Sequence, residues 1–327
     1  MIRCTTTTER WAMHEPFEIA RETITHQAVV MVRLDDGQGH IGCAEAAGVD
    51  YDGETPQSMA VQIDAVRPHL HDALTGAELL HLLPAGGARN ALDCALWDLR
   101  AKQSGVPVWQ AATGTRWHSV TTAYTLGLGD EASTRRKARA ARHFPILKLK
   151  VDAQRHLDVV RVVREEHPDA RIVVDANQAW TLELLHELLP HLQAAGVELV
   201  EQPLARGQDA GLLGCASPIP LAADESCTDR ASLAHLVGRY QFVNIKLDKC
   251  GGLTEGLALA AEARRLGLGL MVGNMCGTSL AMAPAFLLAQ QCSYVDLDGP
   301  LLQTEDRPHA LEYRGGEIQV PGAELWG

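Results

Sequence analysis

Five polar side chains recur at nearly equal intervals along the second half of the chain, each at or near the end of a short apolar run. They are Lys150, Asp175, Glu201, Asp224 and Lys246, and successive members are 25, 26, 23 and 22 residues apart. Each interval is close to one strand-plus-helix unit. Groups spaced in this way converge at the carboxyl ends of parallel strands, where barrel enzymes place their chemistry.

Three carboxylates from neighbouring strands form an all-oxygen site, so Asp175, Glu201 and Asp224 predict a Mg²⁺ centre. Mg²⁺ takes few protein ligands and keeps positions free for water and substrate. Each carboxylate alone has a structural explanation, because Asp175 or Asp224 could cap the following helix and Glu201 could pair with a lysine. Their recurrence at equivalent positions, with lysines on both sides, favours the functional interpretation.

Residues 146–151 (ILKLKV) carry two lysines, Lys148 and Lys150, on one face of a predicted strand. Taken alone, this pattern is typical of an exposed edge strand with solvated lysines. In step with the downstream carboxylates, Lys150 becomes a candidate base and Lys148 its neighbour, one pleat deeper. Repulsion from Lys148 and the charge of the metal would lower the pKa of Lys150 from about 10.4, and Lys148 could also contact the substrate carboxylate.

These groups predict proton transfer next to a carboxylate. With the substrate carboxylate on the metal, Lys150 would face one side of the α-carbon and Lys246 the other, because their strands lie across the barrel. One lysine would remove the α-proton, the metal would stabilise the resulting enediolate, and the second lysine would return a proton to the opposite face. The predicted reaction is therefore an inversion by two-base 1,1-proton transfer.

The elements that must position these residues are short apolar runs that alternate with amphipathic segments from about residue 118. The runs cover residues 121–128, 146–151, 171–175, 197–201, 221–224, 242–247, 269–273 and 294–298, and helix-like segments cover 154–166, 181–195, 231–237 and 254–266. This alternation predicts parallel strands with crossover helices, and eight strands indicate a closed α/β barrel. An open doubly wound sheet is the alternative, but the chain lacks the glycine-rich phosphate loop of such sheets.

The first 112 residues predict a separate α+β unit. Residues 28–34 and 40–44 read as strands joined by a turn, and residues 58–74 and 88–102 read as helices.

Composition excludes several classes of partner. The 327 residues carry a net charge of −12, so neither nucleic acid nor an anionic membrane surface is an expected partner. No apolar run reaches membrane-spanning length, and the N-terminus lacks the apolar core of a secretion signal. Eight scattered cysteines indicate reduced thiols and a cytoplasmic protein. The sequence leaves open whether the chain forms a homo-oligomer.

The chain resembles the enolase superfamily, in its muconate-lactonizing subgroup and more narrowly the dipeptide epimerases. The motifs that carry the resemblance are LKLK with Lys148 and Lys150, VVDANQAW with Asp175 and Asn177, LVEQPL with Glu201, LAADES with Asp224, and NIKLDKCGGLTEGL with Lys246. The resemblance implies an α/β fold with an N-terminal α+β capping domain (1–112), a modified TIM barrel, (β/α)7β (113–305), and a tail that packs back on the cap (306–327). It also implies Mg²⁺ as the cofactor.

Two features narrow the subgroup. Relatives that use a His–Asp dyad need a histidine at the seventh strand end, where this chain has Val272 to Met275. At the eighth strand, Asp296 and Asp298 share a face under strand alternation and could bind the ammonium of a dipeptide, as the resemblance to dipeptide epimerases implies. An acidic pair after a strand is otherwise often a solvated turn.

The predicted substrate is accordingly a dipeptide. The alternatives are an L-Ala-D/L-Glu epimerase proper, or a cycloisomerase, dehydratase, o-succinylbenzoate synthase or N-acylamino acid racemase with the same lysines and ligands. The resemblance implies that two cap loops, at about residues 17–26 and 48–55, reach over the barrel and determine which substrate side chain is accepted. In relatives that act on Ala-Glu, it implies an arginine in the first of these loops, and here the aligned residue is Ile24, with Arg21 preceding it. The lack of an arginine at this position favours an apolar side chain on the second residue of the dipeptide. Asn177 and Met275 are expected to bind the substrate, although Met275 fits the core equally well.

We predict structural roles for three other polar residues. Asp93 and Asp98 lie in the cap helix at 88–102, and Lys249 follows the strand of Lys246 but falls out of step with the carboxylates. A barrel retained only for binding would be expected to lose at least one of the five recurrent groups, and all five are present.

Overall fold

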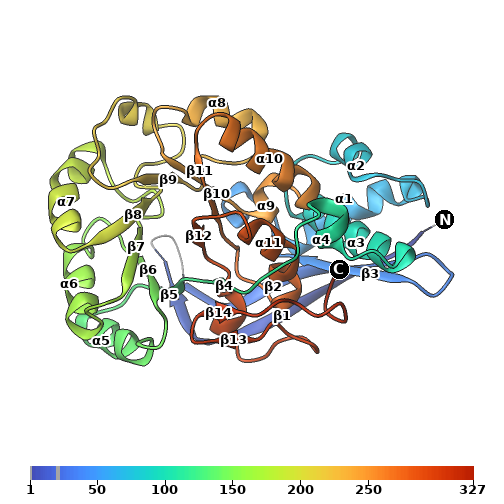
Figure 1. Ribbon diagram of the computed structural model, residues 1–327, viewed down its shortest axis with the longest axis horizontal. Coiled ribbons are helices and arrows are strands. Elements are labelled where there is room, and N and C mark those ends of the chain that lie inside the picture. Colours follow the sequence, from blue (N-terminus) through green and yellow to red (C-terminus); the bar gives the residue numbers. More distant parts are fainter. Residues whose placement is uncertain (1, 20–22) are drawn as a thin grey trace.

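The computed structural model describes residues 2–19 and 23–327. A cap of long antiparallel strands and short helices lies beside a larger parallel sheet that curls upon itself, and both chain ends lie on the cap side (Figure 1). Arg21 lies outside the described residues.

The cap is built on three antiparallel strands, β1 (Arg3–Glu18), β2 (Thr23–Asp35) and β3 (Ile41–Ala46), hydrogen-bonded in that order. The strands predicted at 28–34 and 40–44 are confirmed as parts of β2 and β3. The sequence does not predict β1, because its threonines and charged residues do not alternate clearly with apolar ones. It is a strand because it pairs with β2 over most of its length.

Four helices complete the cap: α1 (Pro56–Val66), α2 (Gly76–Leu82), α3 (Gly87–Ser104) and α4 (Val108–Ala112). The helix predicted at 88–102 is confirmed as α3. The helix predicted at 58–74 is wrong beyond Val66, where the chain passes into a 3-10 turn, Arg67–His69. Pro68 explains this end, because proline has no N–H for a helical hydrogen bond and disfavours helical geometry at the residue before it.

The barrel sheet contains eight parallel strands, which confirms the predicted fold class. They are β5 (Tyr124–Leu126), β6 (Ile146–Lys150), β7 (Arg171–Asp175), β8 (Val197–Glu201), β9 (Leu221–Ala223), β10 (Phe242–Ile245), β11 (Gly269–Val272) and β12 (Tyr294–Val295). They are hydrogen-bonded in sequence order. The N–H of Ala123 donates to the carbonyl of Val295 at 2.8 Å, so the two edges of the curled sheet meet.

Helices surround the sheet on its outer face (Figure 1). They are α5 (Glu131–Ala140), α6 (Leu157–Glu166), α7 (Leu182–Ala194), α8 (Leu233–Leu236), α9 (Leu247–Cys250), α10 (Leu253–Arg265) and α11 (Ser279–Ala289). The predicted helical segments are confirmed, although the one at 231–237 is a single α-helical turn after a 3-10 turn. The sequence does not predict α11 as a helix, because it is apolar on all sides and almost wholly buried.

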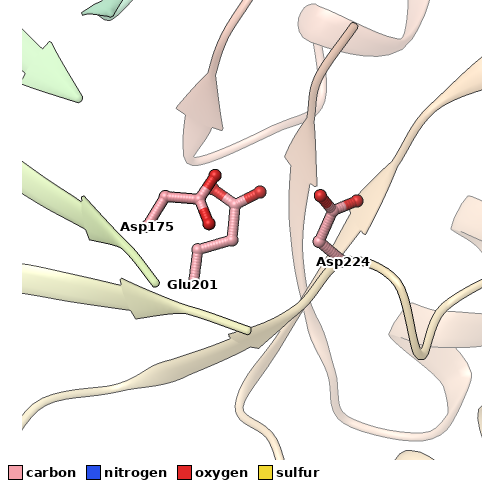
Figure 2. A group of neighbouring side chains, drawn as sticks. All are labelled: Asp175, Glu201 and Asp224. Atoms are coloured by element: carbon pink, nitrogen blue, oxygen red, sulfur yellow. The ribbon is translucent and has the colours of Figure 1, made fainter. Parts of the chain in front are cut away.

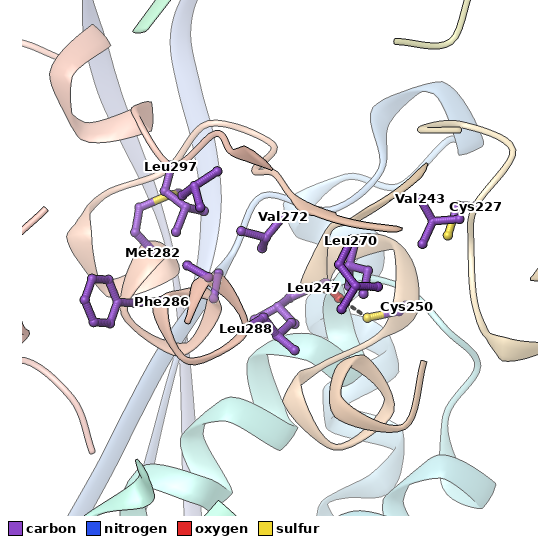
Figure 3. Packing of buried hydrophobic residues seen from close by; sticks show 14 of the residues in the cluster. Cys227, Val243, Leu247, Cys250, Leu270, Val272, Met282, Phe286, Leu288 and Leu297 are labelled. Atoms are coloured by element: carbon purple, nitrogen blue, oxygen red, sulfur yellow. Dashed lines mark hydrogen bonds between the residues drawn. The ribbon is translucent and has the colours of Figure 1, made fainter. Parts of the chain in front are cut away.

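Two apolar clusters hold these layers together. A small one fills the barrel floor with Ala123, Ile146, Val173, Leu199, Ala222 and Met271. The larger one joins the outside of the sheet to the helices and the cap, and Figure 3 shows part of it, with Val272 of β11 and Leu288 of α11. The strands are therefore fixed from both faces.

The C-terminal segment returns to the cap. The indole N–H of Trp326 donates to the carbonyl of Cys94 at 3.0 Å, and the N–H of Gly327 donates to Asp98 at 2.8 Å. Near the start of the segment, Arg307 pairs with Glu9 and with the buried Glu45 of β3. Asp98 thus has a structural contact, as the sequence predicts.

Within the described parts of the chain, no helix combines the length and apolar character that crossing a bilayer requires.

Candidate active site

The inward-facing side chains of the barrel form levels, because alternate residues of each strand point inward. The apolar floor is the first level. Two residues further along the same strands come the polar groups Thr125, Lys148, Asp175, Glu201 and Asp224. The strand register places Lys150 beside Asp175 and Asp175 beside Glu201. The apolar floor and the charged centre are therefore successive levels of inward-facing side chains, two residues apart along each strand.

The structure brings the three predicted metal ligands together. Asp175, Glu201 and Asp224 are buried, and each offers an oxygen within 4.8 Å of those of the other two (Figure 2). They come from the ends of β7, β8 and β9, which are neighbours in the sheet. This is the convergence that the sequence intervals predict.

Lys148 lies deepest among the lysines, with its ammonium among carboxylates. Its Nζ is 2.8 Å from Glu201 Oε2, 3.1 Å from Asp175 Oδ2 and 2.8 Å from Asp296 Oδ2. Burial lowers the pKa of this ammonium, but the charges of the surrounding carboxylates outweigh burial and hold the pKa well above its ordinary value. The exposed-edge interpretation of this strand is wrong, because every residue of β6 is buried.

The two candidate bases lie on opposite sides of the carboxylates. Lys150 Nζ is 2.7 Å from Asp175 Oδ2, and Lys246 Nζ is 2.7 Å from Asp224 Oδ2. Three strands separate β6 from β10, and both lysines line one cavity. Burial lowers the pKa of Lys246, but the charge of Asp224 overcomes this and raises the pKa above its ordinary value. Lys246 therefore carries a proton in this arrangement.

Charge is unevenly shared among the three carboxylates. Burial opposes ionisation of Asp224, but Lys246 and Lys249 outweigh burial and hold its pKa well below the usual range. Burial raises the pKa of Glu201 to about 7, and the charge of Asp175 adds to that rise. The ammonium of Lys148, 2.8 Å from Glu201 Oε2, does not offset this rise. Three converging hard oxygen donors, whose ionised forms a further positive charge would favour, fit a divalent cation such as Mg²⁺.

Asp296 and Asp298 are buried, so the interpretation of a solvated turn is wrong. Strand β12 ends at Val295, before both residues, and each instead contacts Thr125 of β5. The N–H of Thr125 donates to Asp298 Oδ2 at 2.6 Å. Burial raises the pKa of Asp298 to about 7, and the charge of Asp296 adds to the rise. Among the described residues, Asp298 has no lysine or arginine within ion-pair distance, whereas Asp296 has Lys148.

A cavity of about 260 Å³ lies over this centre, between cap and barrel. Its lining includes Lys150, Asp224 and Lys246 from the barrel, together with the predicted Ile24, Asn177 and Met275. Lys148, Asp296 and Asp298 lie outside the lining. The cap contributes residues 47, 48, 50, 51, 54 and 55, which confirms that the predicted second loop reaches the site.

Three residues within the sequence motifs support the carboxylates through contacts that the sequence does not predict. Asn244 donates to Glu201 Oε1 at 2.8 Å, and Gln202 Oε1 accepts the N–H of Asp224 at 2.9 Å. Lys249 is buried against Asp224, so it is structural and not a surface residue. Strand alternation from Lys246 identifies Asn244, but the contacts of Gln202, which follows β8, and of Lys249, which lies in α9, depend on tertiary structure that no local sequence pattern indicates.

Comparison with known protein families finds one matching family for the N-terminal part of the chain and another for the C-terminal part. Residues 1–111 match the mandelate racemase / muconate lactonizing enzyme N-terminal domain, and residues 130–324 match the enolase C-terminal domain-like family.

Two characterised relatives have similar sequences. The chain is 46% identical to an N-acetyl-D-glutamate racemase from Pseudoalteromonas over 77% of its own length and 79% of the relative. It is 42% identical to the L-Ala-D/L-Glu epimerase of Escherichia coli over 95% of its length and 98% of the relative.

Solved structures give the same fold. An enolase family member from Agrobacterium tumefaciens, with homology to dipeptide epimerases and with sodium and L-Ala-L-Glu bound, superposes with a TM-score of 0.97 over both full chains at 41% identity. The dipeptide epimerase of Enterococcus faecalis, complexed with Mg and L-Leu-L-Tyr, gives a TM-score of 0.91 at 26% identity, covering 99% of this chain and 98% of that one. The chain therefore belongs to the mandelate racemase / muconate lactonizing enzyme family of the enolase superfamily.

Proposed function

We propose that the protein is a Mg²⁺-dependent dipeptide epimerase that inverts an α-carbon by two-base proton transfer. The observation that carries the proposal is the placement of Lys150 and Lys246 on opposite sides of three buried carboxylates, in the lining of one cavity. The named relatives support it, because one epimerises L-Ala-D/L-Glu and a second was solved with Mg and a dipeptide.

The reaction needs one lysine as base and the other as acid. The neutral amine of one lysine takes the α-proton, and the electrons of the broken C–H bond move into the substrate carboxylate to give an enediolate. The ammonium of the opposite lysine then donates a proton to the other face, so that the configuration is inverted. Lys246, whose proton is held by Asp224, is the donor when Lys150 is the base.

Asp175, Glu201 and Asp224 would hold the metal. A Mg²⁺ ion bound there supplies positive charge that stabilises the substrate carboxylate as negative charge builds up on its oxygens. Lys148 fixes the ligands from below, through contacts with Asp175 and Glu201, and its charge lies on the same side of the centre as Lys150. Lys148 and Lys150 share Asp175 Oδ2, and we propose that Lys148 acts on Lys150 through this shared contact.

Asp298 supports a substrate with a free ammonium. It is a buried carboxylate with no described lysine or arginine within ion-pair distance, and a dipeptide ammonium would supply that partner. The pair of Asp296 and Asp298 is therefore proposed to hold the amino terminus. Asn177 and Met275, in the cavity lining, are proposed to contact the remainder of the substrate.

We propose that the second residue of the dipeptide is apolar. Ile24 lies in the cavity lining where relatives acting on Ala-Glu are expected to carry an arginine. The acidic groups Asp50 and Glu54 also line this side, and they would repel a substrate γ-carboxylate. The eight cysteines are free thiols, which supports the proposed cytoplasmic location.

A second candidate function is racemisation of an N-acylated amino acid, favoured by the 46% identity to the Pseudoalteromonas enzyme. The same lysines and carboxylates would serve, but the substrate would bring no ammonium to Asp298.

The proposed function is tested by incubating the protein with Mg²⁺ and a dipeptide library in D₂O and following deuterium at the α-carbon. Exchange and inversion with a subset of dipeptides are expected. Exchange of N-acetyl amino acids alone would favour the second candidate, and exchange of neither class would overturn both.

A further inference from the structure

We infer that Asp248 is a positioning residue that fixes the cap loop 48–55 relative to Lys246. The inference concerns how the cap is aligned with one of the two bases. It rests on the proposed function for its catalytic consequence, but not for its structural one.

The carboxyl of Asp248 belongs to the barrel, but its partners belong to the cap. Its Oδ1 accepts the N–H of Gly48 at 2.8 Å, in a buried hydrogen bond. Ala47 and Asn90, also of the cap, lie near the same carboxyl and lower its pKa. Cap groups therefore surround one buried barrel carboxyl, and a buried carboxyl left without the Gly48 hydrogen bond would be costly.

The path from this contact to Lys246 is short. Asp248 lies in α9, a single helical turn, and Lys246 immediately precedes that turn. The carbonyl of Lys246 accepts the N–H groups of Lys249 and Cys250 at 3.0 and 3.1 Å, which fixes the backbone between base and carboxyl. Lys246 and Gly48 both line the 260 Å³ cavity, so one helical turn and one hydrogen bond set the width of the site there.

The other contacts of the loop do not replace this one. Glu54 accepts the N–H groups of Val49 and Gly87 at 2.8 and 2.9 Å, but both partners belong to the cap. Arg206 of the barrel pairs with Asp52, and the two side chains are 41% and 37% exposed, where ion pairs contribute little. The Asp248 contact, by contrast, is a buried hydrogen bond that ties this loop to the barrel.

The backbone at Gly48, which makes the hydrogen bond to Asp248, has little conformational freedom. Its φ is +79°, and a Cβ placed on it would lie 2.9 Å from Met59 Sδ. The backbone is therefore pressed against α1 on one side and held by Asp248 on the other. If Asp248 is lost, the beginning of the loop can move away from Lys246, while Lys150, on the opposite side, keeps its own contacts.

The matched control is Asp93, which makes a similar contact away from the cavity. It is a buried cap carboxyl whose Oδ2 accepts the N–H of Thr254 at 2.8 Å and whose Oδ1 accepts the Thr254 hydroxyl at 2.6 Å. It also joins cap to barrel, but it does not line the cavity. Asp248→Ala and Asp93→Ala thus remove comparable contacts, and Asp248→Asn keeps one acceptor oxygen for a variant that folds if the alanine variant does not.

The first readout is amide hydrogen exchange in the full-length protein, which is independent of any substrate. Asp248→Ala is expected to speed exchange of residues 46–55 about tenfold or more, Asp248→Asn to speed it less, and Asp93→Ala to leave this segment unchanged. Unchanged exchange at 46–55 in the Asp248 variants would overturn the inference, whatever their activity.

The second readout separates the two bases. When the substrate is the epimer whose α-proton Lys150 removes, the Asp248→Ala variant should still exchange this proton with solvent but should no longer invert the configuration. When the substrate is the epimer whose α-proton Lys246 removes, the rates of α-proton exchange and of inversion should both fall about tenfold or more, because small displacements of a catalytic group are costly. Equal losses for both epimers would overturn the link to Lys246. If the unaltered protein exchanges no dipeptide, the proposed function fails, and amide exchange still decides the inference.

Discussion

Lys249 Nζ lies 2.6 Å from Asp224 Oδ1, whereas Lys246, the proposed second base, contacts the other oxygen of that carboxylate. The same ammonium donates to the main-chain carbonyls of Asp224 and Asn244. One oxygen of Asp224 is thereby engaged, and the other, Oδ2, is turned toward Lys246. The buried Lys249 thus fixes the orientation of the Asp224 carboxylate, which is a proposed metal ligand.

Replacement of Lys249 by methionine should weaken Mg²⁺ binding about 10- to 100-fold, because Asp224 loses the group that orients it. Isothermal titration with Mg²⁺ measures this directly. Lys102→Met is the control, since Lys102 pairs with Asp98 in the cap. Equal Mg²⁺ affinity in Lys249→Met and the unaltered protein would show that Asp224 needs no such support.

Replacement of Ile24 by arginine should change the choice of second residue. A cation at this position can pair with a γ-carboxylate, so the ratio of kcat/KM for L-Ala-L-Glu to that for L-Ala-L-Leu should rise about tenfold or more. Ile24→Met, which stays apolar, should leave the ratio nearly unchanged. A preference for L-Ala-L-Glu already present in the unaltered protein would contradict the assignment of an apolar second residue.

Replacement of Asp298 by alanine should separate dipeptides from N-acylated substrates. Loss of a buried partner for the substrate ammonium should lower kcat/KM for dipeptides about 100-fold or more, whereas an N-acetyl amino acid has no ammonium to lose. Asp169→Ala, at an exposed acid outside the cavity lining, is the control. If dipeptide turnover survives in Asp298→Ala, the ammonium is bound elsewhere.

The stability of the protein should depend on the ionisation of Asp248. Burial raises its pKa to about 7 in the folded protein, against about 3.9 in an unfolded chain. Between these values the folded state holds a proton that the unfolded state releases. The contribution of this group to stability is therefore complete below about pH 4 and is lost as the pH rises to about 7.

Asp248→Asn does not titrate and isolates this effect. The free energy of unfolding of the unaltered protein, minus that of Asp248→Asn, should fall by up to about 1.4 kcal/mol per pH unit between about pH 4 and 7 and be constant above. Urea denaturation at a series of pH values measures it. A difference that does not vary with pH would mean that Asp248 is ionised throughout.

The sequence predicts the catalytic level of the barrel well, for a physical reason. Lys150, Asp175, Glu201 and Asp224 lie at or directly after strand ends, and strand register alone brings such residues together. The strand bounds at β7 and β8 coincide with the predicted runs. The alternation of residues along each strand determines this part of the fold, so it can be predicted from a single sequence.

Other parts depend on contacts that local patterns do not encode. Strand β1 forms through its pairing with β2, and α11 has no polar face to mark its period. The positions of Asp298 and Asp248 follow from loops that meet Thr125 and Gly48 across 173 and 200 residues of chain. Such contacts become visible only once the tertiary fold is known.

The central claim, that two lysines act on opposite faces of one α-carbon, is tested most directly by variants that each remove one base. Lys150→Met and Lys246→Met would be given each epimer of a turned-over dipeptide, with Mg²⁺ in D₂O, and α-deuterium and configuration would be followed together. Each variant should lose inversion, and each should retain α-proton exchange with one epimer only, the opposite epimer in the two variants. Inversion by either variant, or exchange of the same epimer by both, would contradict the two-base assignment.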